Sequence, residues 1–325
     1  MSESPPNEKQ LSDLQRDLTA LADELSRIVV GQEVTARQMT AAVVVGGHVL
    51  LEGLPGVGKT RLAEALADAL QITSQRVQFT PDLMPADLLG TYVVMESAQG
   101  RRTFEFQKGP IFSHLVLADQ INRGLPKTQS AMLEAMEGET ISVANETFEL
   151  PQPFFVVATQ NPLEMEGTFP LPEPQLDRFL LKVNVAPPSE EQLDTILAQT
   201  TEGSPPEARA LLTGARLLQM RDLAARVPID VEVRRQVARL VSRTHPTHAE
   251  APEMVRRFVQ YGASPRGAQA LVQVAKVRAV AEGRPAVGTE DLQQLAHVVL
   301  RHRLILNHEG QAEGIDPDRL IDAIL

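Results

Sequence analysis

The sequence predicts an α/β protein in which a parallel sheet is flanked by helices and followed by a small domain made of helices. Short apolar runs alternate with helical patterns over the first 186 residues, as in successive strand–helix–strand units. Polar residues gather where several of these runs end, as they do at the carboxyl ends of parallel strands. After residues 186–188 the apolar spacing is helical almost to the end. We therefore predict an N-terminal amphipathic helix (1–27), an α/β core (28–186) and a helical domain (187–325).

Composition limits the class of protein. The chain has 325 residues, of which 43% are apolar and 22% charged, which is typical of a globular protein with one large core. It has no cysteine, so disulfides and thiolate metal sites are excluded. The first six residues lack the basic start and apolar run of a secretory signal, and no segment approaches the length of a membrane span, so we expect a cytoplasmic protein. The net charge of −11 opposes a long basic groove for nucleic acid.

The first elements surround a glycine-rich loop. Leucines and one isoleucine recur every three or four residues over Leu11–Val29, which predicts a helix with a glycine stop at Gly31. Ala41–Leu51 is a β-branched apolar run and predicts a strand. Apolar residues at helical spacing over Arg61–Leu70 predict a second helix.

The loop between this strand and helix fits the phosphate-loop pattern G-x-x-x-x-G-K-[ST] through Gly53, Gly58, Lys59 and Thr60. In such loops backbone N–H groups surround phosphates, the lysine reaches the β- and γ-phosphates, and the threonine hydroxyl binds Mg²⁺. Glycine is required because a Cβ would keep the backbone away from the phosphate. We therefore predict a nucleotide and Mg²⁺ as ligands, with contacts from Gly53, Pro55, Gly56, Val57, Gly58, Lys59, Thr60 and Arg61.

The remaining core elements follow the same strand–helix pattern. Short strands are predicted at Arg76–Phe79, at 115–118 before Asp119, at 154–158 before the polar group 159–162, and in the segment ending at Val185. Asp82–Gly90 reads as a turn or a short helix broken by Pro85, and Met132, Leu133 and Met136 mark a helix. Alternating segments predict two inserted hairpins, at about 91–106 with a turn at 97–100, and at about 140–150 around Asn145.

The helical domain has clear starts. Ser189 and Gln192 form a capping box, and Ser264 is an N-cap followed by Pro265 at the first helical position. The seven histidines show no metal-ligand spacing, and His302, between two arginines, is interpreted as an exposed helix residue. The lysines and arginines of this domain are expected to form mostly solvated faces.

Taken together, these stretches resemble the AAA+ ATPases and, within them, the MoxR family. The resemblance implies an AAA+ P-loop NTPase core with an insert in its second helical region and a hairpin before the sensor strand, a small helical lid, usually a hexameric ring, and a chaperone-like role with partners that carry von Willebrand factor A domains. The matching stretches, in the family's order, are GLPGVGKT (53–60), QFTPDLMPADLLG (78–90), LVLADQINR (115–123), PKTQSAMLEAME (126–137), PFFVVATQNP (153–162), LDRF (176–179) and GASPRGAQAL (262–271).

Within that resemblance Asp119 and Thr60 are the expected Mg²⁺ ligands, with a helix N-cap as the alternative role of Asp119. Asn161 resembles the first sensor, which orients the attacking water; otherwise its Asn-Pro dipeptide is a turn. Val30, Gly31 and Gln32 resemble the segment that packs around adenine.

Arg178 resembles the arginine that one subunit presents to the γ-phosphate of its neighbour, and the alternative is a surface pair with Asp177 or Glu173. Arg266, at the start of a lid helix, resembles the second sensor, which couples γ-phosphate to the position of the lid. Arg123 is either at a subunit interface or solvated.

The chain departs from the family at Gln120, where the family has a glutamate that accepts a proton from the attacking water. An amide does not accept that proton at neutral pH, and the loss of a positioned base costs about 10²–10⁴-fold in rate. We therefore predict a protein that binds Mg·ATP and hydrolyses it slowly. Two origins fit, an engineered substitution that traps the ATP state or a natural member that has given up turnover, and we favour the first.

The leading functional hypothesis is a mechanical ATPase, a ring in which nucleotide state shifts lid against core and the two hairpins act on a protein partner. A second is an ATP-gated scaffold that assembles without turnover, which Gln120 favours. A nucleic-acid motor is disfavoured by the negative charge and the 4% aromatic content. A metabolic kinase would leave the arginine and sensor matches unexplained.

Overall fold

The computed structural model describes residues 4–96, 102–144, 146–163, 167–201, 203 and 206–325. Its centre is a parallel sheet of five strands in the order β2-β5-β8-β1-β9. This confirms the predicted fold class. The strands are β1 (His48–Glu52), β2 (Ser74–Gln78), β5 (Leu115–Asp119), β8 (Phe155–Gln160) and β9 (Phe179–Asn184).

Both faces of this sheet are covered, which explains why its strands read as continuous apolar runs rather than alternating ones. Val49 and Leu51 of β1 lie in one core layer with helices α1 (Glu8–Ile28), α2 (Glu33–Val45) and α3 (Lys59–Ala69). Leu50, between them, points to the other face and packs in a layer with α4 (Pro85–Leu89) and α5 (Pro126–Gly138).

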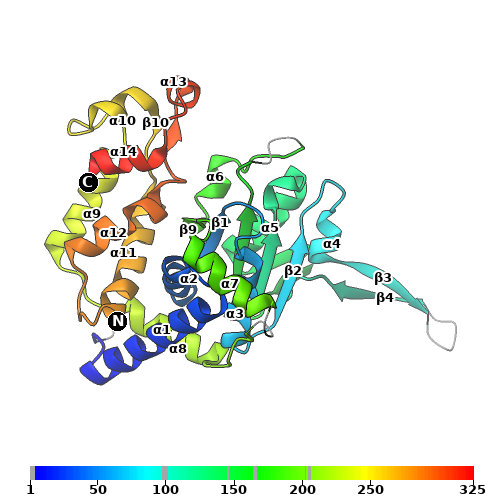
Figure 1. Ribbon diagram of the computed structural model, residues 1–325. Helices are drawn as coiled ribbons and strands as arrows, with labels where there is room; N and C mark the ends of the chain where they lie inside the picture. Colours follow the sequence, from blue (N-terminus) through cyan, green and yellow to red (C-terminus); the bar gives the residue numbers. More distant parts are fainter. Residues whose placement is uncertain (1–3, 97–101, 145, 164–166, 202, 204–205) are drawn as a thin grey trace.

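Both predicted hairpins are present. The first pairs β3 (Gly90–Glu96) with β4 (Arg102–Lys108), and the second pairs β6 (Thr140–Val143) with β7 (Glu146–Glu149). The turn predicted at 97–100 and Asn145 lie outside the described residues. Phe106 of the first hairpin stacks on Phe148 of the second at a centroid distance of 4.4 Å, so the two inserts contact each other. The first hairpin projects from the side of the core opposite the C-terminal helices (Figure 1).

The C-terminal part of the chain is mainly helical. Besides the helices it contains one short antiparallel pair, β10 (Val259–Tyr261) with β11 (Ile305–Leu306), which the sequence did not predict. Helices α9 to α14 gather beside the core, whereas α7 lies over it (Figure 1). The helices are α7 (Glu190–Thr201), α8 (Gly214–Ala225), α9 (Val231–Arg243), α10 (Glu253–Phe258), α11 (Pro265–Ala281), α12 (Thr289–Leu300), α13 (His308–Ala312) and α14 (Pro317–Ile324).

Two short helices flank strands of the sheet. The short helices η1 (Ile121–Arg123) and α6 (Glu173–Leu176) follow β5 and precede β9, respectively. Helix α1 contacts α2, α3 and α11, so the N-terminal helix is packed between the core and the C-terminal helices. In the part of the chain that is described, no helix has the length and apolar character needed to cross a bilayer.

Two local predictions were wrong. The run Ala41–Leu51 is not one strand, because its first five residues finish α2, Gly46 ends that helix at a φ of 84°, and β1 starts only at His48. The β-branched residues Val43 and Val44 are fully buried against neighbouring helices, and this packing outweighs their preference for strands. The short helix predicted within Asp82–Gly90 is present as α4, but Pro85 begins it rather than breaking it, because a missing N–H costs nothing at the first helical position.

Candidate nucleotide-binding site

The glycine-rich loop follows the carboxyl end of β1 and leads directly into α3. Gly56 and Gly58 have φ values of 82° and 91°, a left-handed conformation that glycine adopts without strain. A Cβ on Gly58 would lie 2.6 Å from Cγ1 of Val29, whereas one on Gly56 would meet nothing within 4 Å. The loop is therefore tightly fitted to the core on one side and open at Gly56.

The Lys59 ammonium lies over this loop. It donates hydrogen bonds to the carbonyl oxygens of Gly53 at 2.6 Å and Leu54 at 2.8 Å. Lys59 is also the first residue of the 11-residue helix α3, whose N-terminal N–H groups and dipole favour an anion. The loop, the lysine and the helix start thus present positive charge to one place.

Asp119 ends β5, which is separated from β1 by β8. The Asp119 side chain is 12% exposed, and its carboxylate accepts hydrogen bonds from Thr159 Oγ1 at 2.6 Å and from the Arg76 guanidinium at 2.6 and 3.1 Å. The residue before helix η1 is Gln120, so Asp119 is not the helix N-cap that was its alternative role. A carboxylate at a strand end and the hydroxyl of Thr60 are oxygen donors of the kind that Mg²⁺ prefers, so these residues fit that ion.

Gln120 has φ 54° and ψ 52°, a left-handed conformation that costs energy for any residue with a Cβ. Its N–H donates to Thr159 Oγ1 at 2.8 Å, and its Oε1 accepts from Gln78 Nε2 at 2.8 Å. The Thr159 hydroxyl therefore joins Asp119 and Gln120. Sequence reasoning assigned no role to Arg76, Gln78 or Thr159, although Thr159 belongs to the polar group at the end of its strand.

Asn161 follows β8 and is 7% exposed. Its Oδ1 accepts the N–H of Leu163 at 3.2 Å, so the side chain closes a turn of its own loop. Because β8 lies between β5 and β1, this residue follows the strand between the Asp119 strand and the glycine-rich loop. The turn and the predicted sensor position are compatible with each other.

A cavity of about 450 Å³ lies beside the loop. Its lining includes Val30 and Gln32, residues 56–58 of the loop, and Ile196 and Gln199 of α7. The Gln32 amide donates to the carbonyl of Ala186 and accepts from Thr35 Oγ1, each at 2.9 Å.

Gly31 and Arg61 also lie at or beside this cavity. A Cβ on Gly31 would come within 2.5 Å of the Gln192 side chain, so the start of α7 approaches the segment predicted to contact adenine. Arg61 also lines the cavity and donates to the carbonyl of Pro206 at 2.6 Å. That α7 faces this cavity could not be predicted from sequence, because its apolar residues are spaced like those of any amphipathic helix.

Arg178 lies at the other end of the sheet. The parallel register pairs Phe179 with His48 and Asn184 with Glu52, so Arg178 is level with the start of β1 while the glycine-rich loop follows its end. A strand of five residues spans about 16 Å. Arg178 is therefore remote from the loop of its own chain.

Arg178 and Arg266 share one carboxylate. A terminal nitrogen of Arg178 lies 2.8 Å from Oε2 of Glu137, and one of Arg266 lies 2.8 Å from Oε1. Asp177 and Glu173, the surface partners considered for Arg178, are not its partners. Arg178 pairs with Glu137 near the end of α5, and the Asp177 carboxylate is bound to Arg303 instead. Glu137 was not singled out by the sequence.

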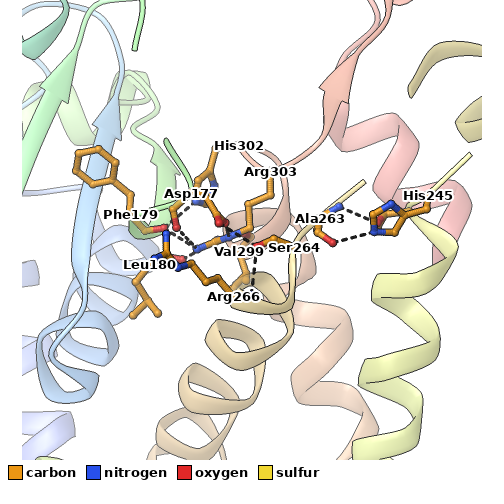
Figure 2. Close-up of polar contacts among 11 residues, drawn as sticks. Asp177, Phe179, Leu180, His245, Ala263, Ser264, Arg266, Val299, His302 and Arg303 are labelled. Carbon is orange, nitrogen blue, oxygen red and sulfur yellow. Dashed lines mark hydrogen bonds and ion pairs between the residues drawn. The ribbon is translucent and has the colours of Figure 1, made fainter. Parts of the chain in front are cut away.

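Asp177 instead joins the core to the lid helices. Its carboxylate accepts from Arg303 Nε at 2.8 Å and from Ser264 Oγ at 2.9 Å (Figure 2). Arg303 is 5% exposed and also donates to the carbonyl oxygens of Phe179, Leu180, Asp177 and Val299. Burial lowers the pKa of the Arg303 guanidinium, and the Asp177 carboxylate opposes that effect. The expectation that lid arginines are solvated is therefore wrong for Arg303.

The prediction for His302 was also wrong. Its ring is 6% exposed, because it packs at the junction of core and lid and its Nε2 bonds the Phe179 carbonyl at 2.9 Å (Figure 2). Burial, together with the neighbouring Arg303 charge, lowers the pKa of His302 well below its usual value.

The predicted caps are confirmed, since Ser264 Oγ accepts the Arg266 N–H and Ser189 forms both bonds of its capping box with Gln192. Arg123 is exposed at the end of η1.

Comparison with known proteins agrees with this geometry. Residues 48–181 match the family model described as ATPase family associated with various cellular activities (AAA), and residues 252–324 match the AAA lid domain. A crystal structure of a protein from Cytophaga hutchinsonii superimposes with a TM-score of 0.89 at 35% identity, covering 98% of this chain and 96% of that one. A parallel sheet with a phosphate loop and a separate lid defines the chain as an AAA+ ATPase.

Similar proteins identify the family within the AAA+ ATPases. The chain is 40% identical to Chaperone MoxR1 of Mycobacterium tuberculosis, over 93% of this chain and 79% of the relative. It is 39% identical to the uncharacterized protein YeaC of Bacillus subtilis (96% and 94% covered) and 32% identical to Protein MoxR of Methylorubrum extorquens (98% and 96% covered). The chain belongs to the MoxR family of AAA+ ATPases, which confirms the resemblance drawn from its motifs.

Proposed function

We propose that this chain binds Mg·ATP, forms a ring, most simply a hexamer, and acts as a chaperone-like remodeller of partner proteins in the cytoplasm. The observation that carries the proposal is the Lys59 ammonium held over an open glycine-rich loop, with Asp119 and Gln120 ending a nearby strand of the same sheet. The name of the M. tuberculosis relative, a chaperone, supports the remodelling role. By the family resemblance, partners carry von Willebrand factor A domains.

Each residue at the carboxyl edge of the sheet has a part in this proposal. Lys59 and the loop N–H groups bind the triphosphate, and Thr60 and Asp119 hold Mg²⁺, which neutralises phosphate charge. For Asp119 to do so, the Arg76 guanidinium has to share or release its carboxylate. Asn161 orients water. Val30 and Gln32 line the adenine side of the adjoining cavity, with Val57 and Arg61. Gly31 lies between the first two and approaches Gln192 at the start of α7.

Gln120 makes turnover slow in this proposal. Its amide oxygen already accepts from Gln78, and an amide has no capacity to take a proton from water at neutral pH. Binding persists, because glutamine keeps the shape of glutamate and removes a negative charge near the phosphates. An engineered ATP trap accounts for this, as does a natural member without turnover; the latter would act as an ATP-gated scaffold.

The ring rests on the position of the two arginines. Arg178 is remote from its own loop, and Arg266 shares a carboxylate with it, so we assign both to the nucleotide of a neighbouring protomer. A cation presented in this way stabilises charge on the transferred phosphoryl group. Partner contact is assigned to the first hairpin, where Val94, Met95 and Phe104 are 54%, 50% and 76% exposed. A nucleic-acid motor is disfavoured by the net charge of −11.

The test is particle mass by sedimentation with Mg·ATP, with Mg·ADP and without nucleotide, together with ATP binding by calorimetry. We expect ATP binding and a larger particle with ATP. Lys59→Ala removes the charge-assisted contacts to phosphate and should weaken binding about 10- to 100-fold. Absence of binding in the unmodified chain would refute the nucleotide site, and a monomer in all three conditions would refute the ring.

A further inference from the structure

Glu137 is the link between the two arginines. It ends α5 of the core, Arg178 precedes β9 of the core, and Arg266 begins α11 of the lid. Each guanidinium uses a different oxygen of the same carboxylate, at 2.8 Å in both cases. Arg178 is held further by a hydrogen bond from its Nη1 to the Leu133 carbonyl, one turn earlier in α5. Two like charges are thus brought together over a single anion.

Ordinary exposed ion pairs contribute little, and nothing about stability would require this arrangement. The side chains of Glu137 and Arg266 are 49% and 52% exposed, so either could be solvated separately. Gathering two guanidinium groups at one point is unfavourable unless an anion lies between them. A carboxylate that offers one oxygen to each guanidinium presents the same acceptor chemistry as a terminal phosphate group.

We propose that Glu137 is a resident counter-ion that occupies, in the free chain, the place taken by the γ-phosphate of the neighbouring protomer in the ring. It keeps Arg178 and Arg266 converged and screens their charge until a nucleotide-loaded copy of the chain displaces it. Glu137 is therefore a positioning residue that also opposes assembly. The inference rests on the proposed function, because it presumes that both arginines serve a neighbour's nucleotide.

The test compares the ATP-dependent assembly of Glu137→Gln with that of the unmodified chain. Loss of two partly exposed ion pairs frees the arginines for phosphate. The protein concentration at which half of the chains are assembled with Mg·ATP should therefore fall about three- to ten-fold. Glu134→Gln is the matched control, since Glu134 lies on the exposed face of α5 one turn earlier and makes no ion pair among the interactions of the described residues. Unchanged or weaker assembly of Glu137→Gln, with an unchanged melting temperature, would overturn the proposal.

A double-mutant cycle separates this inference from the proposed function. If Glu137 acts through the two arginines, Glu137→Gln should strengthen assembly less once Arg266 is alanine, because only the ion pair with Arg178 is then released. A gain of the same size in the Arg266→Ala background would contradict the counter-ion role. If Arg178→Ala by itself leaves ATP-dependent assembly unchanged, the assignment of that arginine to a neighbour fails, whatever Glu137 does.

Discussion

Polar residues have different roles at the carboxyl ends of the central strands (the carboxyl edge) and at their amino ends (the amino edge). At the carboxyl edge, Lys59 and Gln120 bond to other polar groups beside an open loop and a cavity, where a ligand can replace those partners. At the amino edge, Arg303 and His302 are buried and satisfy carbonyl oxygens of β9 itself. The first edge is built for exchange with a ligand, and the second fixes the lid to the core.

The largest expected effect is at the carboxyl edge. Gln120→Glu restores a carboxylate able to accept a proton, and the rate of ATP hydrolysis should rise about 10²–10⁴-fold. Phosphate release measured under excess ATP checks this. Lys59→Ala in the Gln120→Glu background should abolish the gain, and a turnover rate unaffected by Gln120→Glu would remove the argument that the missing base limits hydrolysis.

This edge was also the more predictable from sequence. The phosphate loop needs glycines, a lysine and a hydroxyl at fixed spacing, and Lys59 bonds residues only five and six positions away. Asp119 was identified because a strand ends at it. The contacts of Arg76 and Thr159 with Asp119 span 43 and 40 residues and depend on strand order, which no local pattern encodes.

The amino edge was predicted less well for the same reason. Arg303 and Asp177 are 126 positions apart, and no pattern in the sequence near either residue predicts their ion pair. His302 was judged by its charged sequence neighbours, but its exposure is decided by β9 packing onto it. The end of α2 was misread because β-branched residues are common to strands and to buried helix faces.

The next largest effect should be a loss of stability at the amino edge. Asp177→Asn removes the carboxylate that pairs with the buried Arg303 guanidinium, and breaking such a pair from one side costs about 3 kcal/mol. Urea unfolding measures this. Asp322→Asn, whose carboxylate is 67% exposed beside His297, is the control and should change stability by less than about 0.5 kcal/mol. Equal effects of the two variants would show that Asp177–Arg303 does not fix the lid.

Acid should weaken the amino edge as well. Burial lowers the pKa of His48 to about 4, because the ring is enclosed at the start of β1. Its Nδ1 accepts the Val156 N–H, so a second proton would displace that bond. The unfolded chain binds the proton below about pH 6.5, so the free energy of unfolding should fall by about 1.4 kcal/mol per pH unit from pH 6.5 towards pH 4. The lowered pKa of His302 acts in the same direction.

Urea unfolding at pH 7, 6 and 5 tests this pH dependence. His48→Gln keeps a donor for the Met136 carbonyl and an acceptor for the Val156 N–H but cannot titrate. It should therefore lower the slope of the free energy of unfolding against pH by the contribution of one titrating group, about 1.4 kcal/mol per pH unit. His308→Asn, at an exposed histidine, is the matched control. A slope that His48→Gln leaves intact would place the acid-sensitive group elsewhere.

The smallest expected effect distinguishes two roles of Ser264, the cap of α11 and a hydrogen bond between lid and core. Ser264 Oγ accepts the Arg266 N–H at 3.2 Å and also donates to Asp177, whereas Thr213 Oγ1 accepts the Arg216 N–H at the same 3.2 Å and is exposed. Each alanine substitution loses a helix cap, but only Ser264→Ala also loses a bond across the junction of core and lid. It should therefore cost about 1 kcal/mol more than Thr213→Ala in urea unfolding. Equal costs would mean that Ser264 only caps α11, and that Arg303 alone ties Asp177 to the lid.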